Sequence, residues 1–142
     1  EQRKYLASLG PASEASAAAV RAAEENAKRL EDPAFKATET VDGIPGAYWL
    51  DLRAHDDVAI AARLAVPMLV LQGERDSQVT MTDFTAWTKV LGQRPNVTLR
   101  SYPALNHHFM PGTGKSTPAE YERPNHVAAE VVDDVAKWVL SH

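Results

Sequence analysis

The sequence predicts an α/β protein with a parallel sheet, and the order of elements in its second half supports this prediction. VPMLVLQG (66–73) is an unbroken apolar run between Pro67 and Gly73, as expected of a strand buried on both faces. NVTLRSYP (96–103) alternates and is rich in β-forming residues, which predicts a second strand. A helical stretch follows each strand. Two successive βα units of this kind give a parallel sheet.

Helical spacing of apolar residues predicts the two flanking helices. TMTDFTAWTKVLG (80–92) opens with Thr80 and Asp83 at the spacing of a capping box. HVAAEVVDDVAKWVLSH (126–142) carries its apolar residues along one stripe and is the last predicted helix. The residues expected on the buried faces of the two helices are Phe84, Trp87, Val90, Leu91, Val127, Val131, Val135, Trp138 and Val139.

The first half of the chain is predicted to be less regular. PASEASAAAVRAAEENAKRLE (11–31) is expected to form a solvent-facing helix, because its apolar face is mostly alanine. Residues 33–55 are expected to form a loop that inserts Tyr48, Trp49 and Leu50 into a core, and 56–64 a short helix. Two strands leave unpaired sheet edges, so further strands are expected from elsewhere.

Composition excludes several classes of partner and chemistry. A net charge of −4 and a pI near 5.7 argue against nucleic acid and anionic membranes as partners, and no apolar run reaches the length of a membrane span. The absence of cysteine excludes disulfides, zinc–thiolate sites and a cysteine nucleophile. The chain starts at Glu1 without Met, so we expect it to continue upstream. The compartment stays undetermined: the cytoplasm is the default, and an upstream signal peptide is the alternative.

The stretch GTGKST (112–117) resembles a nucleotide-phosphate loop only in part. A phosphate loop needs a glycine five residues before the one that precedes the lysine, and Phe109 stands at that position. Pro118 follows closely, where a helix should begin on the lysine. We therefore expect a solvated loop around Lys115 and no cofactor.

Possible metal ligands also form no recognisable set. Their spacing matches no familiar ligand pattern, and adjacent side chains rarely converge on one ion. No metal site is expected among the two groups considered, which are Asp51, His55, Asp56 and Asp57, and His107, His108 and His126.

An acid and a base follow the two predicted strands. Asp76 lies three residues beyond Gly73, and His107 lies five residues beyond Tyr102. Adjacent parallel strands deliver both side chains to the same sheet edge, where α/β proteins place their sites. A serine hydrolase needs such a histidine base and a carboxylate that orients it, and the acid-before-histidine order is that of α/β-hydrolases. Taken singly, each could be an ordinary polar loop residue; His108 is expected to be a pocket-wall or surface residue.

The stretches VPMLVLQGERDSQVTMTDFTAW and VTLRSYPALNHHFMPGTGKSTPAEYERPNHV resemble the C-terminal third of bacterial α/β-hydrolases of the dienelactone-hydrolase and serine-aminopeptidase-like kind. The resemblance implies a partial α/β-hydrolase fold: the last parallel strands with flanking helices (44–142), preceded by a helical cap or linker segment (1–43). It also implies that Asp76 is the triad acid and His107 the base. Ser77 stands where the family pattern has tyrosine, and His108 where it has an apolar residue.

The third member of a triad is missing from this chain. None of its seven serines lies in a G-x-S-x-G elbow. We therefore expect the C-terminal part of a serine hydrolase that cleaves a small-molecule ester or amide through an acyl-enzyme, and that is inactive alone. The nucleophile would come from the N-terminal part of the same hydrolase or from a second copy of the chain. The alternative is a non-catalytic binding or assembly module with the same fold.

Overall fold

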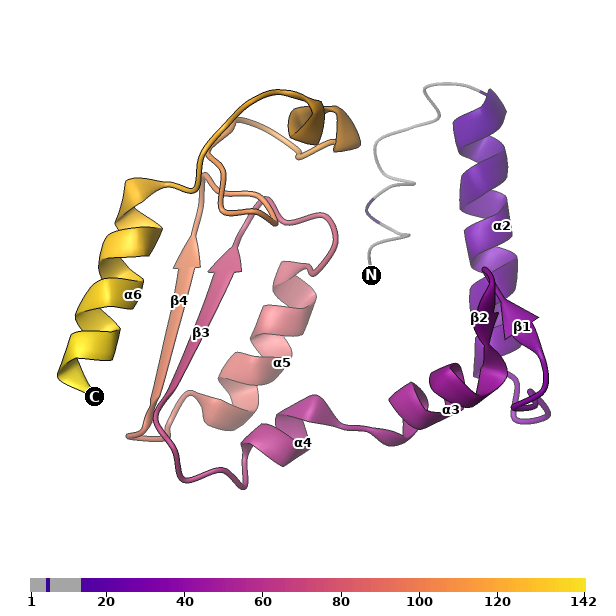
Figure 1. Ribbon diagram of the computed structural model, residues 1–142, viewed down its shortest axis with the longest axis horizontal. Helices are drawn as coiled ribbons and strands as arrows, with labels where there is room; N and C mark the ends of the chain where they lie inside the picture. Colours follow the sequence, from indigo (N-terminus) through magenta and orange to yellow (C-terminus); the bar gives the residue numbers. More distant parts are fainter. Residues whose placement is uncertain (1–4, 6–13) are drawn as a thin grey trace. The chain divides into compact units, whose positions relative to one another are not determined.

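A computed structural model describes Tyr5 and residues 14–142, which divide into two compact units. One unit runs up to Ala61 and the other from Ala62 to His142. Each unit has a small sheet of its own (Figure 1). The second unit contains both Asp76 and His107, so the fold of that unit determines the geometry of the predicted pair.

The sheet of the second unit is parallel. Strand β3 (Met68–Gly73) pairs with β4 (Val97–Tyr102), in a register that runs from Met68 opposite Val97 to Gly73 opposite Tyr102. This parallel pairing between helices confirms the α/β class. Complete burial of the first strand was a wrong prediction, because only Gln72 and Gly73 of β3 are buried and the rest is half-buried. In a sheet of only two strands, each strand has a single neighbour, so β3 keeps part of its surface in solvent.

Helix α5 (Met81–Leu91) lies between the two strands in sequence and starts as predicted. The Asp83 carboxylate accepts the backbone N–H of Thr80 at 2.8 Å, which completes the capping box. At the other end Gly92 donates its N–H to the Thr88 carbonyl at 2.9 Å. Leu91, in the last turn, is fully buried.

Helix α6 (Ala129–Ser141) is shorter at its start than the sequence predicts. The N–H of Ala128 bonds to the Phe109 carbonyl at 2.9 Å, which holds the preceding residues extended against the loop after β4. Val131 of α6 packs with Tyr102 and Leu105 to form the core of this unit. In Figure 1, α5 and α6 flank the two strands.

Burial of the helix faces is incomplete. Of the nine residues expected on them, only Leu91 and Val131 are buried. Two strands cannot cover two amphipathic helices, so the other positions keep part of their surface in solvent. Four of the expected core valines are between 39% and 60% exposed: Val90, Val127, Val135 and Val139.

The first unit contains helix α2 (Glu14–Glu31) and a short hairpin of β1 (Thr40–Val41) and β2 (Ile44–Pro45). Helices α3 (Gly46–Ala54) and α4 (Asp57–Ala61) follow. The helix predicted over 11–31 is present from Glu14, and residues 11–13 lie outside the described residues.

The prediction of a loop over 33–55 was wrong. Asp42 and Gly43, with φ of 52° and 76°, form a two-residue turn that brings β1 and β2 together. Helix α3 then carries the aromatic residues expected in the loop, and Tyr48 is 54% exposed instead of inserted in a core. Trp49 donates its ring N–H to the Val41 carbonyl at 3.4 Å.

Among the described residues, none of the helices combines the length and the apolar character that crossing a membrane requires.

Candidate active site

The chain segments beyond β3 and β4 stay in close contact after the strands end. Glu74 donates its backbone N–H to Tyr102 and Arg75 donates to Leu105, each at 3.0 Å, so main-chain pairing continues past the sheet. A Cβ on Gly73 would lie 2.5 Å from the Leu105 carbonyl oxygen, closer than side chains approach backbone. The strand-end glycine therefore permits the contact that brings the acid and histidine segments together.

The Asp76 carboxylate is held by three hydrogen bonds. Its Oδ1 accepts the backbone N–H groups of Gln78 at 2.8 Å and Val79 at 3.0 Å. Its Oδ2 accepts a hydrogen bond from His107 Nδ1 at 2.8 Å. Asp76 is 7% exposed, whereas the His107 side chain is 34% exposed. The two residues predicted from their positions after the strands are thus in direct contact.

This hydrogen bond determines which nitrogen of His107 remains available. A carboxylate accepts but does not donate, so the bonded Nδ1 carries the hydrogen. In the neutral ring Nε2 then keeps a lone pair and can accept a proton. An imidazole in this tautomer, with part of the ring exposed to solvent, is the arrangement of a general base oriented by an acid.

The loop that carries His107 is a tight turn built around Asn106. The Asn106 Oδ1 atom accepts the backbone N–H groups of His108 at 3.0 Å and Met110 at 3.1 Å. Phe109 has a φ of 54°, a left-handed conformation that closes the turn. Asn106 is fully buried, so these bonds form away from water and fix the backbone next to the histidine.

His108 lies outside the pair. Its side chain is exposed, and its ring centroid lies 5.6 Å from that of His107 and 4.6 Å from that of Tyr121. Of the two adjacent histidines, His107 is therefore the one bonded to the carboxylate, and His108 packs beside it against an aromatic ring.

A second polar cluster, which the sequence analysis did not identify, adjoins the pair. Glu120 of the 3₁₀-helix η1 (Pro118–Glu122) pairs with the buried Arg75 and accepts hydrogen bonds from Asn106 and Ser116. Burial alone would raise the pKa of Glu120, but the hydrogen bonds from Asn106, Arg75 and Ser116 outweigh it and lower that pKa below its usual value. The sequence does hold one signal for Arg75 and Asn106, which is that each immediately precedes a member of the predicted pair. Arg75 precedes Asp76, and Asn106 precedes His107.

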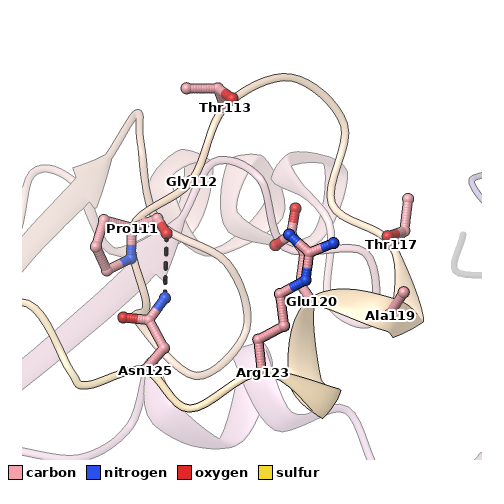
Figure 2. A pocket seen from close by; sticks show the side chains of 8 residues that line it. All are labelled: Pro111, Gly112, Thr113, Thr117, Ala119, Glu120, Arg123 and Asn125. Atoms are coloured by element: carbon pink, nitrogen blue, oxygen red, sulfur yellow. Dashed lines mark hydrogen bonds between the residues drawn. The ribbon is translucent and has the colours of Figure 1, made fainter.

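A hollow of about 370 Å³ lies beside this cluster. In Figure 2 the Glu120 and Arg123 side chains are drawn next to each other at one side, and Asn125 Nδ2 donates to the Pro111 carbonyl at 3.4 Å across from them. The hollow does not include Asp76 or His107. It is lined by Pro111, Gly112, Thr113, Thr117, Ala119, Glu120, Arg123 and Asn125.

Comparison with known proteins relates the chain to a hydrolase. It is 43% identical over 140 residues to Esterase EstD of Thermotoga maritima, a match that covers 99% of this chain and 33% of that protein. The chain is esterase-like in sequence. It spans about a third of the length of the curated relative that it matches. No family model and no solved structure matches the chain.

The match to an esterase agrees with the hydrolase resemblance at that level, whereas the dienelactone-hydrolase assignment stays a prediction. Within the described part of the chain, no three histidine or acidic side chains gather as they would around a metal ion.

Proposed function

We propose that this chain supplies the acid and the base of a serine hydrolase that transfers an acyl group from a small-molecule ester or amide to water. The observation that carries the proposal is the 2.8 Å hydrogen bond between Asp76 Oδ2 and His107 Nδ1. The bond lies beyond the carboxyl ends of two adjacent parallel strands, where α/β folds hold their sites. The identity to an esterase supports the same reaction class.

In the proposed reaction, His107 Nε2 takes the proton of a serine hydroxyl as its oxygen attacks the acyl carbon. The resulting imidazolium is stabilised by the adjacent Asp76 carboxylate and returns the proton to the departing alcohol or amine. Water then attacks the acyl-enzyme, with His107 again accepting and delivering one proton. The carboxylic acid product leaves and the serine is regenerated. Asp76 and His107 therefore end the cycle unchanged.

The serine itself is proposed to come from outside this chain. Among the described serines, Ser116 is fully buried with its hydroxyl on Glu120, and Ser101 donates to Glu74 at 2.7 Å. Ser77 is buried next to the acid but lacks the flanking glycines of an elbow. The N-terminal part of the same hydrolase is the proposed source, and a second copy of the chain is the alternative.

We place the complete protein with the dienelactone-hydrolase and serine-aminopeptidase-like α/β-hydrolases. In that arrangement residues 44–142 form the C-terminal part of the hydrolase domain and residues 1–43 a helical cap or linker segment. The partial α/β-hydrolase fold explains why β3 and β4 lack further neighbours in the described chain. Strands contributed by the rest of the domain would pair with them and cover the exposed valines of α5 and α6.

A serine-directed fluorophosphonate tests the proposal on the assembled hydrolase, meaning this chain together with its nucleophile-bearing segment. We expect covalent labelling and ester hydrolysis, and loss of both in the His107→Ala variant. His108→Ala is the matched control, because that ring lacks the bond to Asp76. Absence of labelling, or full activity in His107→Ala, would leave the binding or assembly module as the better interpretation.

A further inference from the structure

The Glu120 carboxylate joins two side chains whose positions in the sequence are significant. It pairs through Oε1 with the guanidinium of Arg75, and through Oε2 it accepts Asn106 Nδ2 at 3.2 Å. Arg75 immediately precedes Asp76, and Asn106 immediately precedes His107. One carboxylate therefore links the chain neighbours of both members of the pair.

Arg75 also holds the loop that carries Glu120. Its Nε donates to the Gly114 carbonyl at 2.8 Å, and its guanidinium NH₂ groups donate to the Thr113 carbonyl at 3.2 Å and the Ala104 carbonyl at 3.4 Å. A Cβ on Gly112 would lie 2.7 Å from the guanidinium carbon, so the backbone closes directly over this side chain. The arginine is thereby held along its length, and its charge is buried with Glu120 as its counterion.

The third hydrogen bond to Glu120 comes from the segment GTGKST (112–117). The Ser116 hydroxyl donates to Glu120 Oε2 at 3.1 Å, and Ser116 is fully buried. The Gly114 carbonyl accepts from Arg75, as described above. The residues that resemble a phosphate loop thus form part of the scaffold around Glu120.

We propose that Glu120 is a positioning residue, which keeps the Asp76 and His107 segments in register so that their hydrogen bond is maintained. The proposal rests on the proposed function of the pair. It assigns Glu120 no contact with substrate, because it acts through Arg75 and Asn106. The lowered pKa of Glu120 is consistent with this role, since the charged form is the one that accepts all three hydrogen bonds.

Glu120→Gln tests the role, because it keeps the shape of the side chain and removes the charge. Glu122→Gln is the matched control, an exposed glutamate two residues along the same 3₁₀-helix. In the assembled hydrolase we expect Glu120→Gln to lower kcat by about 10- to 100-fold with KM within about threefold, the loss that a small misplacement of catalytic groups produces. Ser116→Ala removes one of the three bonds and should lower kcat by about two- to fivefold.

The second readout is the hydrogen-bonded Nδ1–H proton of His107, observed by NMR on the 142-residue chain. We expect this signal in the wild type and in Glu122→Gln, and its broadening or loss in Glu120→Gln. An unchanged signal in Glu120→Gln, or lost activity with the signal intact, would overturn the proposal. If Glu120→Gln does not fold, Ser116→Ala decides by the same two measurements. Inactivity of the wild-type assembly would instead count against the proposed function. The two failures can be told apart, because the NMR measurement tests the role of Glu120 without the nucleophile.

Discussion

Replacing Asp76 with asparagine should invert the tautomer of His107. In the wild type the Oδ1 atom accepts two backbone N–H groups, from Gln78 and Val79, while Oδ2 accepts His107 Nδ1. If the amide of the variant turned its NH₂ toward the backbone, both N–H groups would lose their acceptor, at a cost of about 1–3 kcal/mol each. The NH₂ group should therefore face His107.

An N–H donor facing Nδ1 forces that nitrogen to present its lone pair, so the hydrogen moves to Nε2. The ring then cannot accept the proton of a serine from the side of Nε2. We expect kcat for a p-nitrophenyl ester in the assembled hydrolase to fall by roughly 10³- to 10⁴-fold, the order that an inverted tautomer costs a catalytic triad. That factor corresponds to about 4–5.5 kcal/mol of transition-state stabilisation.

Two measurements check this prediction. ¹⁵N chemical shifts of the imidazole should show the hydrogen on Nδ1 in the wild-type chain and on Nε2 in Asp76→Asn. Asp133→Asn makes the same chemical change at an exposed position of α6 and should leave both readouts unchanged. Retention of the Nδ1–H tautomer in Asp76→Asn, or a fall in kcat of less than about tenfold, would refute the reasoning.

Three further predictions concern the stability of the unit that carries the pair. Leu105→Ala removes a fully buried side chain from the core and should lower the free energy of unfolding in urea by about 2–5 kcal/mol. Gly73→Ala places a methyl group 2.5 Å from a backbone oxygen, so it should destabilise the unit by at least about 2 kcal/mol. In the matched change Gly114→Ala, nothing lies within 4 Å of the added methyl group, so that variant should be affected only by the strain of its positive φ of 66°. Burial, together with the hydrogen bond to Asp134, raises the pKa of Tyr102 to about 12. Because this folded-state pKa lies above the unfolded value of about 10, the stabilisation is complete below about pH 10 and is lost as the pH rises toward 12; urea titrations of Tyr102→Phe should lack this loss.

Much of the second unit could be predicted because its signals are local. The apolar run before Gly73 and the Thr80–Asp83 spacing predict β3 and the start of α5, which the structure has. Parallel pairing then places Asp76 and His107 at one edge, and the bond between their side chains agrees with that inference. Local pattern and tertiary arrangement agree in this part of the chain.

The hairpin, the cluster around Glu120 and the extent of helix burial are not encoded in local sequence patterns. The hairpin at Asp42–Gly43 has a two-residue turn signal, but its strands are only two residues long, too short for an alternating pattern. The cluster around Glu120 joins side chains 45 and 14 positions apart in the sequence, and no periodicity predicts such contacts. Burial of the helix faces was overestimated because helical spacing indicates which side is apolar and not how much sheet is present to cover it.

The hydrogen bond between Asp76 and His107 lies within one compact unit, which runs from Ala62 to His142. The contacts of Glu120 with Arg75 and Asn106 lie in the same unit. The contacts described above that orient the imidazole therefore all come from within this unit. In a split-enzyme reporter built on this unit, the complementary polypeptide would have to contribute the nucleophile, an oxyanion site and the strands that neighbour β3 and β4.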